Sequence, residues 1–251
     1  MPEQLWFTEI LNHLFAGVVT GLLRLIHIEP RFPQAPITNA IAMQFLVFGF
    51  LVVLFAVVRS RLSVERPGAL QHIFEGIHGF IAEQSHEIIG HGSERFIPYL
   101  VTLGLFILVC NLLGLIPGFE SPTATPVVPL GCAALTFVYY HFHGVRKHGL
   151  WKYLRHFAGP SIGSWWANLL MGTLMVPIEI VSHLARVLSL TVRLFANMFA
   201  GDMVTLIFIS LVPVGVPAIF MGLHMGVSLI QTYVFVLLAM VYLGGAVAEE
   251  H

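Results

Sequence analysis

Long stretches without a charged side chain alternate with short polar stretches along the chain. Residues 38–58 and 97–116 hold no charged residue, and each is long enough to cross about 30 Å of hydrocarbon as a helix. The second stretch ends at Ile116–Gly118, where proline and glycine favour a stop. A third apolar stretch covers residues 127–143. The pattern therefore predicts a first transmembrane helix over 38–58 and a transmembrane hairpin over 96–143.

The segment between these predicted spans, residues 59–95, is mixed. Glutamates such as Glu75 and Glu83 alternate with apolar residues such as Ile73 and Phe80. This spacing is typical of an amphipathic helix that lies at the membrane interface.

The last third of the chain is apolar for longer than an upright span requires. Trp165–Leu211 is almost continuously apolar, and Pro177 is its only proline. As one helix it overruns about 30 Å of hydrocarbon, so it must tilt steeply, break, or lie partly in the membrane plane. Pro213 and Pro217 indicate a turn. Residues 165–248 are therefore predicted to form two long, tilted, antiparallel helices packed as a hairpin.

Composition agrees with this fold class. Hydrophobic residues make up 57% of the 251 residues and charged residues only 10%, against about 25% charged in soluble domains. The net charge of -1 gives no basic surface, so no nucleic-acid partner is expected. We expect an all-α integral membrane protein with about five membrane helices plus an interfacial amphipathic helix.

Lysine and arginine residues predict the orientation. Residues 59–95 and 144–164 hold four Lys or Arg residues each, whereas residues 119–126 hold none. The positive-inside rule then makes 59–95 a cytoplasmic amphipathic segment and 144–164 a cytoplasmic basic loop. Residues 1–37 become an N-terminal extramembrane segment outside the cell, although Arg24 and Arg31 count against this. The C-terminus becomes cytoplasmic.

Arg193 is the most costly residue in the predicted hairpin. A charge at mid-membrane costs about 3 kcal/mol on insertion scales, so it needs a partner or water. Along a straight helix Glu179 lies about 21 Å from it, and Asp202 lies about 13 Å from it on the opposite face. We infer that the counter-charge belongs to another polypeptide; the alternative is an arginine that snorkels or is solvated by water.

Further polar residues accompany Arg193. Glu179, Ser182 and Arg186 continue its face toward the N-terminus, and either line a water-filled crevice or lie at the membrane surface. On the last apolar segment, His224 is predicted at the depth of Asp202, as a proton relay or as an ordinary core histidine. Gln231 is predicted near the depth of Arg193, where its side chain can hydrogen-bond the guanidinium.

The stretch LTVRLFANMFAGDM, Leu190–Met203, resembles the signature of subunit a of the F-type ATP synthase. NLLGLIPG at Asn111–Gly118, SPTAT at Ser121–Thr125 and the final AEEH resemble other parts of that family, and the similarity runs from about residue 70 to the C-terminus. The resemblance implies that Arg193 is the stator arginine and Gln231 the glutamine facing it. It implies an outer half-channel with Asp202, His224 and Asn197, and an inner half-channel with Glu179, Ser182 and Arg186.

One departure from the family pattern stands out. Thr125 and Val127 occupy positions where the family often has an acidic residue and an asparagine, and Pro126 and Pro129 are extra prolines. The outer half-channel is therefore expected to depend more on Glu120, together with Asp202 and His224.

The resemblance implies a non-catalytic, proton-conducting stator subunit in a bacterial inner (plasma) membrane, without cofactor or metal. Its expected partners are the c-ring proteolipid subunits, the peripheral-stalk b subunits and the lipid bilayer. H+ or Na+ coupling stays open. An independent secondary transporter or ion channel is the alternative, but it needs substrate carboxylates of its own.

The stretch HEIIGH at His86–His91 looks like a zinc motif with one residue too many, and a continuous helix puts its histidines about 140° apart.

Overall fold

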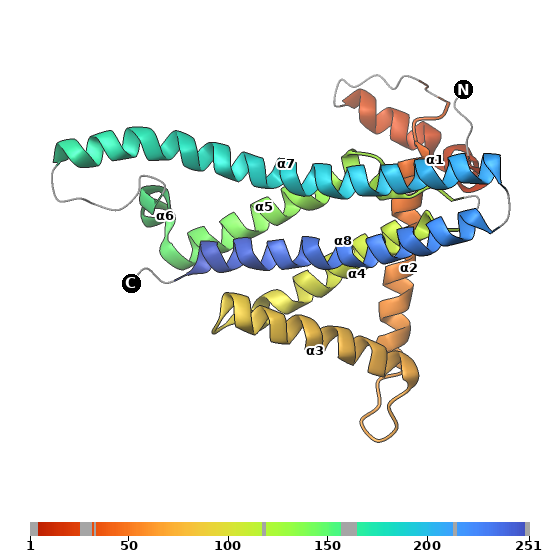
Figure 1. The fold of residues 1–251 in the computed structure, drawn as a ribbon, viewed down its shortest axis with the longest axis horizontal. Helices are drawn as coiled ribbons and strands as arrows, with labels where there is room; N and C mark the ends of the chain where they lie inside the picture. The colour runs from red at the N-terminus through yellow and green to blue at the C-terminus, as the bar shows by residue number, and fades with distance from the viewer. Residues whose placement is uncertain are drawn as a thin grey trace. The chain divides into compact units, whose positions relative to one another are not determined.

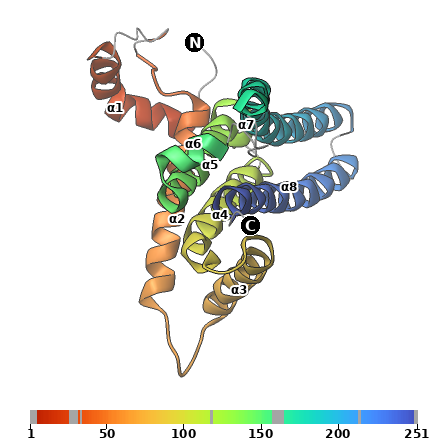
Figure 2. The ribbon, with the colours of Figure 1, turned by 90° about the vertical axis from the view of Figure 1, so that its left-hand side faces the viewer.

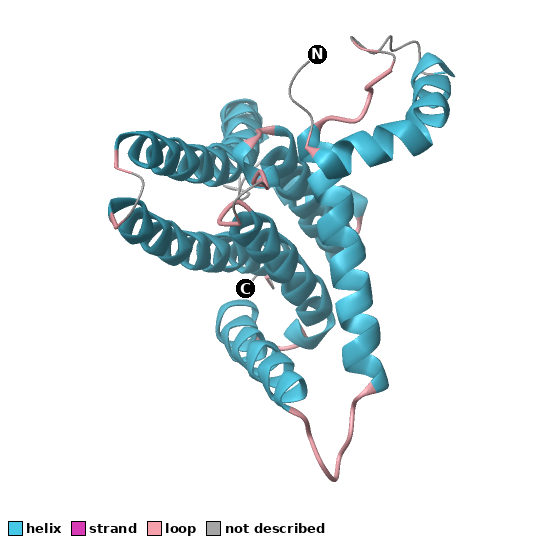
Figure 3. Cartoon of the chain, turned by 90° about the vertical axis from the view of Figure 1, so that its right-hand side faces the viewer, coloured by secondary structure: helices cyan, strands magenta, loops and turns pink. Residues whose placement is uncertain are grey.

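The computed structural model describes residues 5–25, 32, 34–116, 119–156, 165–212 and 215–248. These residues form helices and connections and no strand (Figure 3). In chain order (Figure 1) the elements are α1 Trp6–Leu25, α2 Asn39–Ser60, α3 Ala69–Ile89, the 3-10 turn η1 Ser93–Phe96, α4 Ile97–Leu113, the 3-10 turn η2 Pro122–Ala124, α5 Val127–His148, α6 Leu150–His156, α7 Trp165–Leu211 and α8 Val216–Val247. The all-α prediction is confirmed.

Five helical segments of the described residues are long and apolar enough to cross a membrane: Trp6–Leu25, Asn39–Ser60, Ser93–Leu113, Met171–Leu211 and Val216–Val247. Four of them coincide with predicted spans. The fifth, α1, falls in the segment predicted to be extramembrane, and its location relative to the membrane stays a prediction. Helix α5 covers the predicted third span but is less apolar, because it ends in Arg146, Lys147 and His148.

Helix α7 is not broken, which was one of the alternatives that the sequence left open. It is continuous over 47 residues and carries Pro177 inside it. Such a helix is about 70 Å long, more than twice the hydrocarbon thickness, so it must tilt or extend beyond the bilayer. The predicted turn residue Pro213 and the C-terminal residues 249–251 lie outside the described residues.

The chain divides into two compact units. The first unit combines Met1–Glu75, Gly104–Thr125 and Phe195–Thr232, and the second combines Gly76–Leu103, Pro126–Leu194 and Tyr233–His251. Helices α4, α7 and α8 contribute residues to both units.

In the first unit, two asparagine side chains join α1 to the segment that leads into α2. Figure 2 shows these two helices meeting at their ends. The buried Asn12 donates its Nδ2 to the carbonyl of Ile37 at 3.0 Å, and its Oδ1 accepts the Ile37 N–H at 3.0 Å. The Asn39 side chain accepts the Leu5 N–H at 3.2 Å and donates to Glu120 at 3.0 Å. These bonds satisfy backbone groups that have no helical partner.

The first unit also contains half of the predicted hairpin. The end of α7 packs antiparallel to the start of α8, since contacting pairs move in opposite directions along the two helices: Asn197 with Gln231, Asp202 with His224, and Phe208 with Phe220. Figures 1 and 2 both show these two stretches side by side. The predicted helical hairpin is confirmed.

The second unit is closed by small residues and aromatic rings. Tyr99 stacks on Tyr139 with ring centroids 3.9 Å apart. Gly244 in α8 meets the backbone of α3, because a Cβ there would lie 3.1 Å from the Ile88 carbonyl oxygen. Lys147 caps the end of α8 by donating to the Val247 carbonyl at 2.8 Å.

Gly144 permits the closest helix contact in this unit. A Cβ on it would lie 2.5 Å from Cε2 of Tyr153 in α6 and 3.1 Å from the Ala246 carbonyl oxygen. The Tyr153 ring cannot easily withdraw, because it is buried and its hydroxyl lies 2.6 Å from Nδ1 of His141.

We predict that Gly144→Ala lowers the free energy of unfolding by about 1–3 kcal/mol through overpacking. Gly131→Ala in the same helix is the control: no atom lies within 4 Å of its Cβ position, and helix propensity stabilises it by up to about 1 kcal/mol. Thermal unfolding of the two purified variants in detergent checks this, and equal midpoints contradict the packing account.

Candidate functional site

The polar stripe predicted on α7 exists on one continuous helix of the second unit. Glu179, Ser182 and Arg186 are half-buried, and Arg193 is exposed. No carboxylate among the described residues forms an ion pair with Arg193. Its guanidinium therefore has no ion pair within the described part of its own chain, and a counter-charge on another polypeptide stays a prediction.

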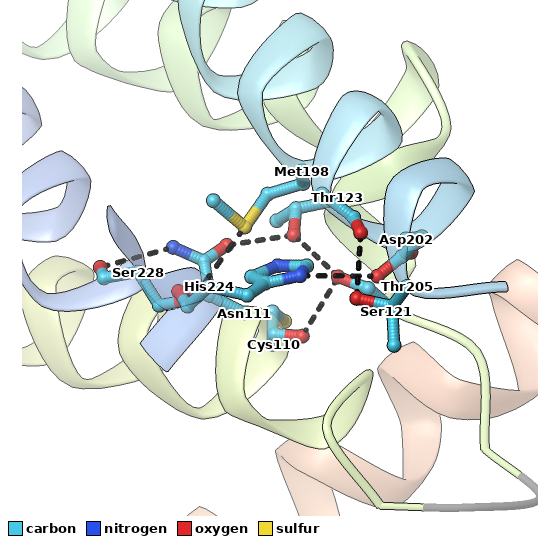
Figure 4. Close-up of polar contacts among 10 residues, drawn as sticks. Cys110, Asn111, Ser121, Thr123, Met198, Asp202, Thr205, His224 and Ser228 are labelled. Carbon is cyan, nitrogen blue, oxygen red and sulfur yellow. Dashed lines mark hydrogen bonds and ion pairs between the residues drawn. The ribbon is translucent and has the colours of Figure 1, made fainter. Parts of the chain in front are cut away.

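In the first unit, Asp202 and His224 lie together. Oδ1 of Asp202 is 3.7 Å from Nδ1 of His224, and the carboxylate side chain is 22% exposed (Figure 4). The His224 side chain is 3% exposed, and its Nε2 has no hydrogen-bond partner among the described residues. The predicted approach of these two residues, from two antiparallel helices, is present.

Gly201 is the residue that lets His224 reach its position. A Cβ at Gly201 would lie 2.5 Å from Nδ1 and 2.7 Å from Cε1 of the imidazole. Contacts that short do not occur, so any larger residue must displace the ring. The glycine just before Asp202 therefore belongs to the site for steric reasons.

A buried hydrogen-bond chain lies beside this pair and was not assigned a role from the sequence (Figure 4). The Thr123 hydroxyl donates to Asn111 Oδ1 at 2.7 Å, and Asn111 Nδ2 donates to the Ser228 carbonyl at 3.4 Å. Ser121 bonds Thr123 at 2.8 Å and the Cys110 carbonyl at 3.1 Å. These residues fix the end of α4 to α8, and the NLLG and SPTAT motifs were the available signal.

Gly114 brings the end of α4 close to Asp202. Its Cβ position lies 2.7 Å from Cβ of Ser121 and 3.3 Å from Oδ1 of Asp202. A larger residue at position 114 would therefore clash with Ser121 and press on the Asp202 carboxylate.

Thr125 and Val127, the two residues that depart from the family pattern, make no described contact with the Asp202 carboxylate. Thr125 donates its hydroxyl to the Pro122 carbonyl at 2.9 Å, within its own turn. Val127 is 67% exposed. Glu120 is exposed and accepts from Asn39 at 3.0 Å, so its described hydrogen bond ties α2 to the loop.

Asn197 and Gln231 are also brought together in the first unit. Nδ2 of Asn197 donates to Oε1 of Gln231 at 2.9 Å. Gln231 is 4% exposed, and its Nε2 has no acceptor among the described residues. Its described partner is thus Asn197, and its contact with Arg193 stays a prediction.

A pocket of about 280 Å³ separates these two polar pairs. It is lined by Asn197, Ala200, Gly201 and Val204 of α7 and by Phe220, Leu223, His224 and Val227 of α8. It has room for several water molecules.

The second unit holds a second polar cluster, of which the sequence indicated only Glu179 and Arg186. Nε2 of His183 is 3.3 Å from Oε1 of Glu179, and its Nδ1 is 2.8 Å from the Tyr140 hydroxyl. The Arg186 guanidinium lies 5.2 Å from the centroid of the Tyr242 ring. His183 comes one helical turn after Glu179, and that spacing was the signal that was missed.

Tyr153 extends this cluster toward α6. Burial raises the pKa of Tyr153 to about 12, so its hydroxyl stays neutral and bonds His141. The ring centroids of His141 and His183 are 4.6 Å apart.

No group of three or more His, Cys, Asp and Glu side chains among the described residues is arranged to hold a metal ion. The two histidines of HEIIGH, however, lie closer together than predicted. Helix α3 ends at Ile89 and Gly90 turns with φ 82°, so the His86 and His91 rings come within 5.9 Å instead of diverging on a continuous helix.

Comparison with known proteins assigns the family. The family model described as ATP synthase A chain matches residues 41–244. The chain is 55% identical to ATP synthase subunit a of Koribacter versatilis over the full length of both proteins. It is 50% identical to ATP synthase subunit a of Solibacter usitatus, over 96% of this chain and 99% of the relative. It is 39% identical to ATP synthase subunit a of Geotalea uraniireducens, over 95% of this chain and 98% of the relative. The chain therefore belongs to the ATP synthase subunit a family.

Proposed function

We propose that this chain is the proton-conducting stator subunit in the membrane sector of an F-type ATP synthase. The observation that carries the proposal is Arg193, an exposed guanidinium on an apolar helix without a carboxylate partner among the described residues. A rotating ring of c subunits, each bearing a membrane carboxylate, supplies the counter-charge. The chain itself catalyses no bond rearrangement.

Physical chemistry explains why a fixed arginine suits this role. A guanidinium remains protonated even when desolvated, whereas a lysine can lose its charge. Its positive charge favours the ionised form of an approaching ring carboxylate, so the carboxylate releases its proton beside Arg193. The same charge repels protons and prevents a direct leak from one side to the other.

Two offset half-channels give the proton path its direction. Asp202, His224 and Asn197 form the outer half-channel, supported by the short Asp202–His224 separation and by the pocket that His224 and Asn197 line. Glu179, Ser182 and Arg186 form the inner half-channel. A proton gains about 2.3 kcal/mol per 100 mV across the membrane, and the break between the two crevices converts that energy into rotation.

Gln231 is proposed to face Arg193 and limit its freedom. Its Oε1 already accepts from Asn197 at 2.9 Å, and a carbonyl oxygen has a second lone pair for a guanidinium N–H. Asn197 would then orient the glutamine amide.

The placement in the cell is part of the same proposal. The relatives are bacterial proteins and the chain has several membrane-length helices, which supports the inner (plasma) membrane. The loop charges support a periplasm-facing N-terminus and a cytoplasmic C-terminus. The peripheral-stalk b subunits are the expected stator partners beside the c-ring.

We predict that Arg193→Ala lowers proton-driven ATP synthesis by at least ~100-fold, since removing one partner of a buried ion pair costs about 3–5 kcal/mol. Arg61→Ala, in an exposed connection, is the control and keeps full activity. ATP synthesis by membrane vesicles that hold the whole complex measures this. Coupled synthesis in the Arg193 variant at the control rate removes Arg193 from the mechanism.

We predict that Gly201→Ala slows proton flow about tenfold or more, as His224→Ala does, because the added methyl displaces the imidazole from Asp202. Gly226→Ala is the matched control in α8, since no atom lies within 4 Å of its Cβ position. ATP-driven acidification of inverted vesicles reports the flow, and co-purification of ring and soluble head reports assembly. Unchanged proton flow in both the Gly201 and the His224 variants contradicts the assignment of His224 to the outer half-channel.

Co-purification separates this function from the alternative of an independent transporter. A stator subunit purifies in mild detergent with small proteolipids and a soluble ATPase head. We predict that complex; a chain that transports ions alone in liposomes contradicts the proposal.

A further inference from the structure

His183 is a buried imidazole held on both nitrogens. It is 8% exposed and lies on α7, one turn after Glu179. Nε2 is 3.3 Å from a Glu179 oxygen, and Nδ1 is 2.8 Å from the Tyr140 hydroxyl of α5. Both ring nitrogens therefore have a partner, and the imidazole connects a carboxylate to a buried tyrosine.

The surroundings of His183 contain charges of both signs. On its own helix, a Glu179 oxygen is 3.3 Å from Nε2, and Arg186 follows three residues later. From α5, Tyr140 and His141 face it; the His141 ring centroid is 4.6 Å away. Tyr153 of α6 bonds His141, and Tyr242 of α8 has its ring centroid 6.1 Å from that of Tyr140.

Glu179 is the exposed end of this cluster. Its side chain is 37% exposed, whereas that of His183 is 11% exposed. The carboxylate thus stands at the open end of a three-residue chain that continues through His183 to Tyr140, which is 2% exposed.

We propose that His183 is a proton-carrying residue of the inner half-channel and that Tyr140 positions it. The inference rests on the proposed function, because it assigns a further residue to the path that contains Glu179. Nothing in the residue-by-residue resemblance to the family assigns either side chain.

The proton step balances on the ring itself. A proton released by a c-ring carboxylate reaches Nδ1 of His183 through water in the inner half-channel, and the Tyr140 hydroxyl turns from donor to acceptor. The imidazole returns to neutrality when the proton on Nε2 passes to the Glu179 carboxylate, which releases it to water. Nε2 then takes a proton from water and Nδ1 gives one up to water, which restores the starting tautomer and leaves the net count at one proton in and one proton out.

Tyr140 orients the imidazole of His183. Its ring packs 5.7 Å from the His183 ring, at an interplanar angle of 25°. Its hydroxyl therefore fixes the imidazole plane, and Nε2 stays directed toward Glu179.

Three variants in membrane vesicles that carry the whole complex test the proposal. His183→Gln keeps an amide for the Tyr140 hydroxyl but cannot be protonated, and Tyr140→Phe keeps the imidazole but frees Nδ1. His78→Gln is the control, since His78 is exposed on α3. ATP-driven proton pumping is measured between pH 5.5 and 8.5, with co-purification of ring and head as the assembly readout.

We expect His183→Gln to lower the pumping rate about tenfold or more and to remove the pH dependence of the rate that a titrating histidine gives. Tyr140→Phe gives a smaller loss with a displaced pH profile. The His78 control retains both rate and profile.

An assembled His183→Gln complex with the wild-type rate, or with a reduced rate and the wild-type pH profile, overturns the proposal. If that variant fails to assemble, Tyr140→Phe decides: a displaced profile supports the relay and an unchanged one overturns it. Arg193→Ala distinguishes a failure of the proposed function from a failure of the role proposed for His183. If the Arg193 variant retains coupled pumping, the proposed function is refuted. If the Arg193 variant loses coupling and the His183 variant is unaffected, only the role of His183 is refuted.

Discussion

The organisation of this protein depends on the cost of placing one guanidinium in an apolar helix. At mid-membrane that cost is about 3 kcal/mol, and the usual remedy is a carboxylate in the same bundle. Arg193 has no such partner among the described residues, although Glu179 and Asp202 are on the same helix. The two acids are instead engaged with histidines, His183 and His224 respectively. The arginine thus stays available to charges outside the chain.

The long helix α7 is the scaffold that keeps these charges apart. It is continuous over 47 residues, and Glu179 and Asp202 lie 23 residues apart along it. Small residues then allow partners to approach Asp202. Gly201 admits the His224 ring, and Gly114 leaves room for the Asp202 carboxylate. Each polar pair is therefore formed locally, at its own position along one helix.

Hydropathy and helical geometry were enough to predict the hairpin, the approach of Asp202 to His224, and the absence of an ion pair for Arg193. They did not identify Asn111, Thr123 or Tyr140, because polar residues that bond across distant segments carry no periodic signal. His183 was also missed, although its spacing of one helical turn from Glu179 was a visible signal. The predicted divergence of His86 and His91 was wrong because Gly90 ends the helix between them.

The central claim is that Arg193 meets acids carried by a neighbouring subunit. A structure of the intact complex in a lipid nanodisc tests it most directly, by locating the Arg193 guanidinium. We predict that it faces the c-ring with a ring carboxylate within about 4–6 Å as that subunit passes. A guanidinium bound to a carboxylate of its own chain, or directed into lipid away from the ring, would contradict the account.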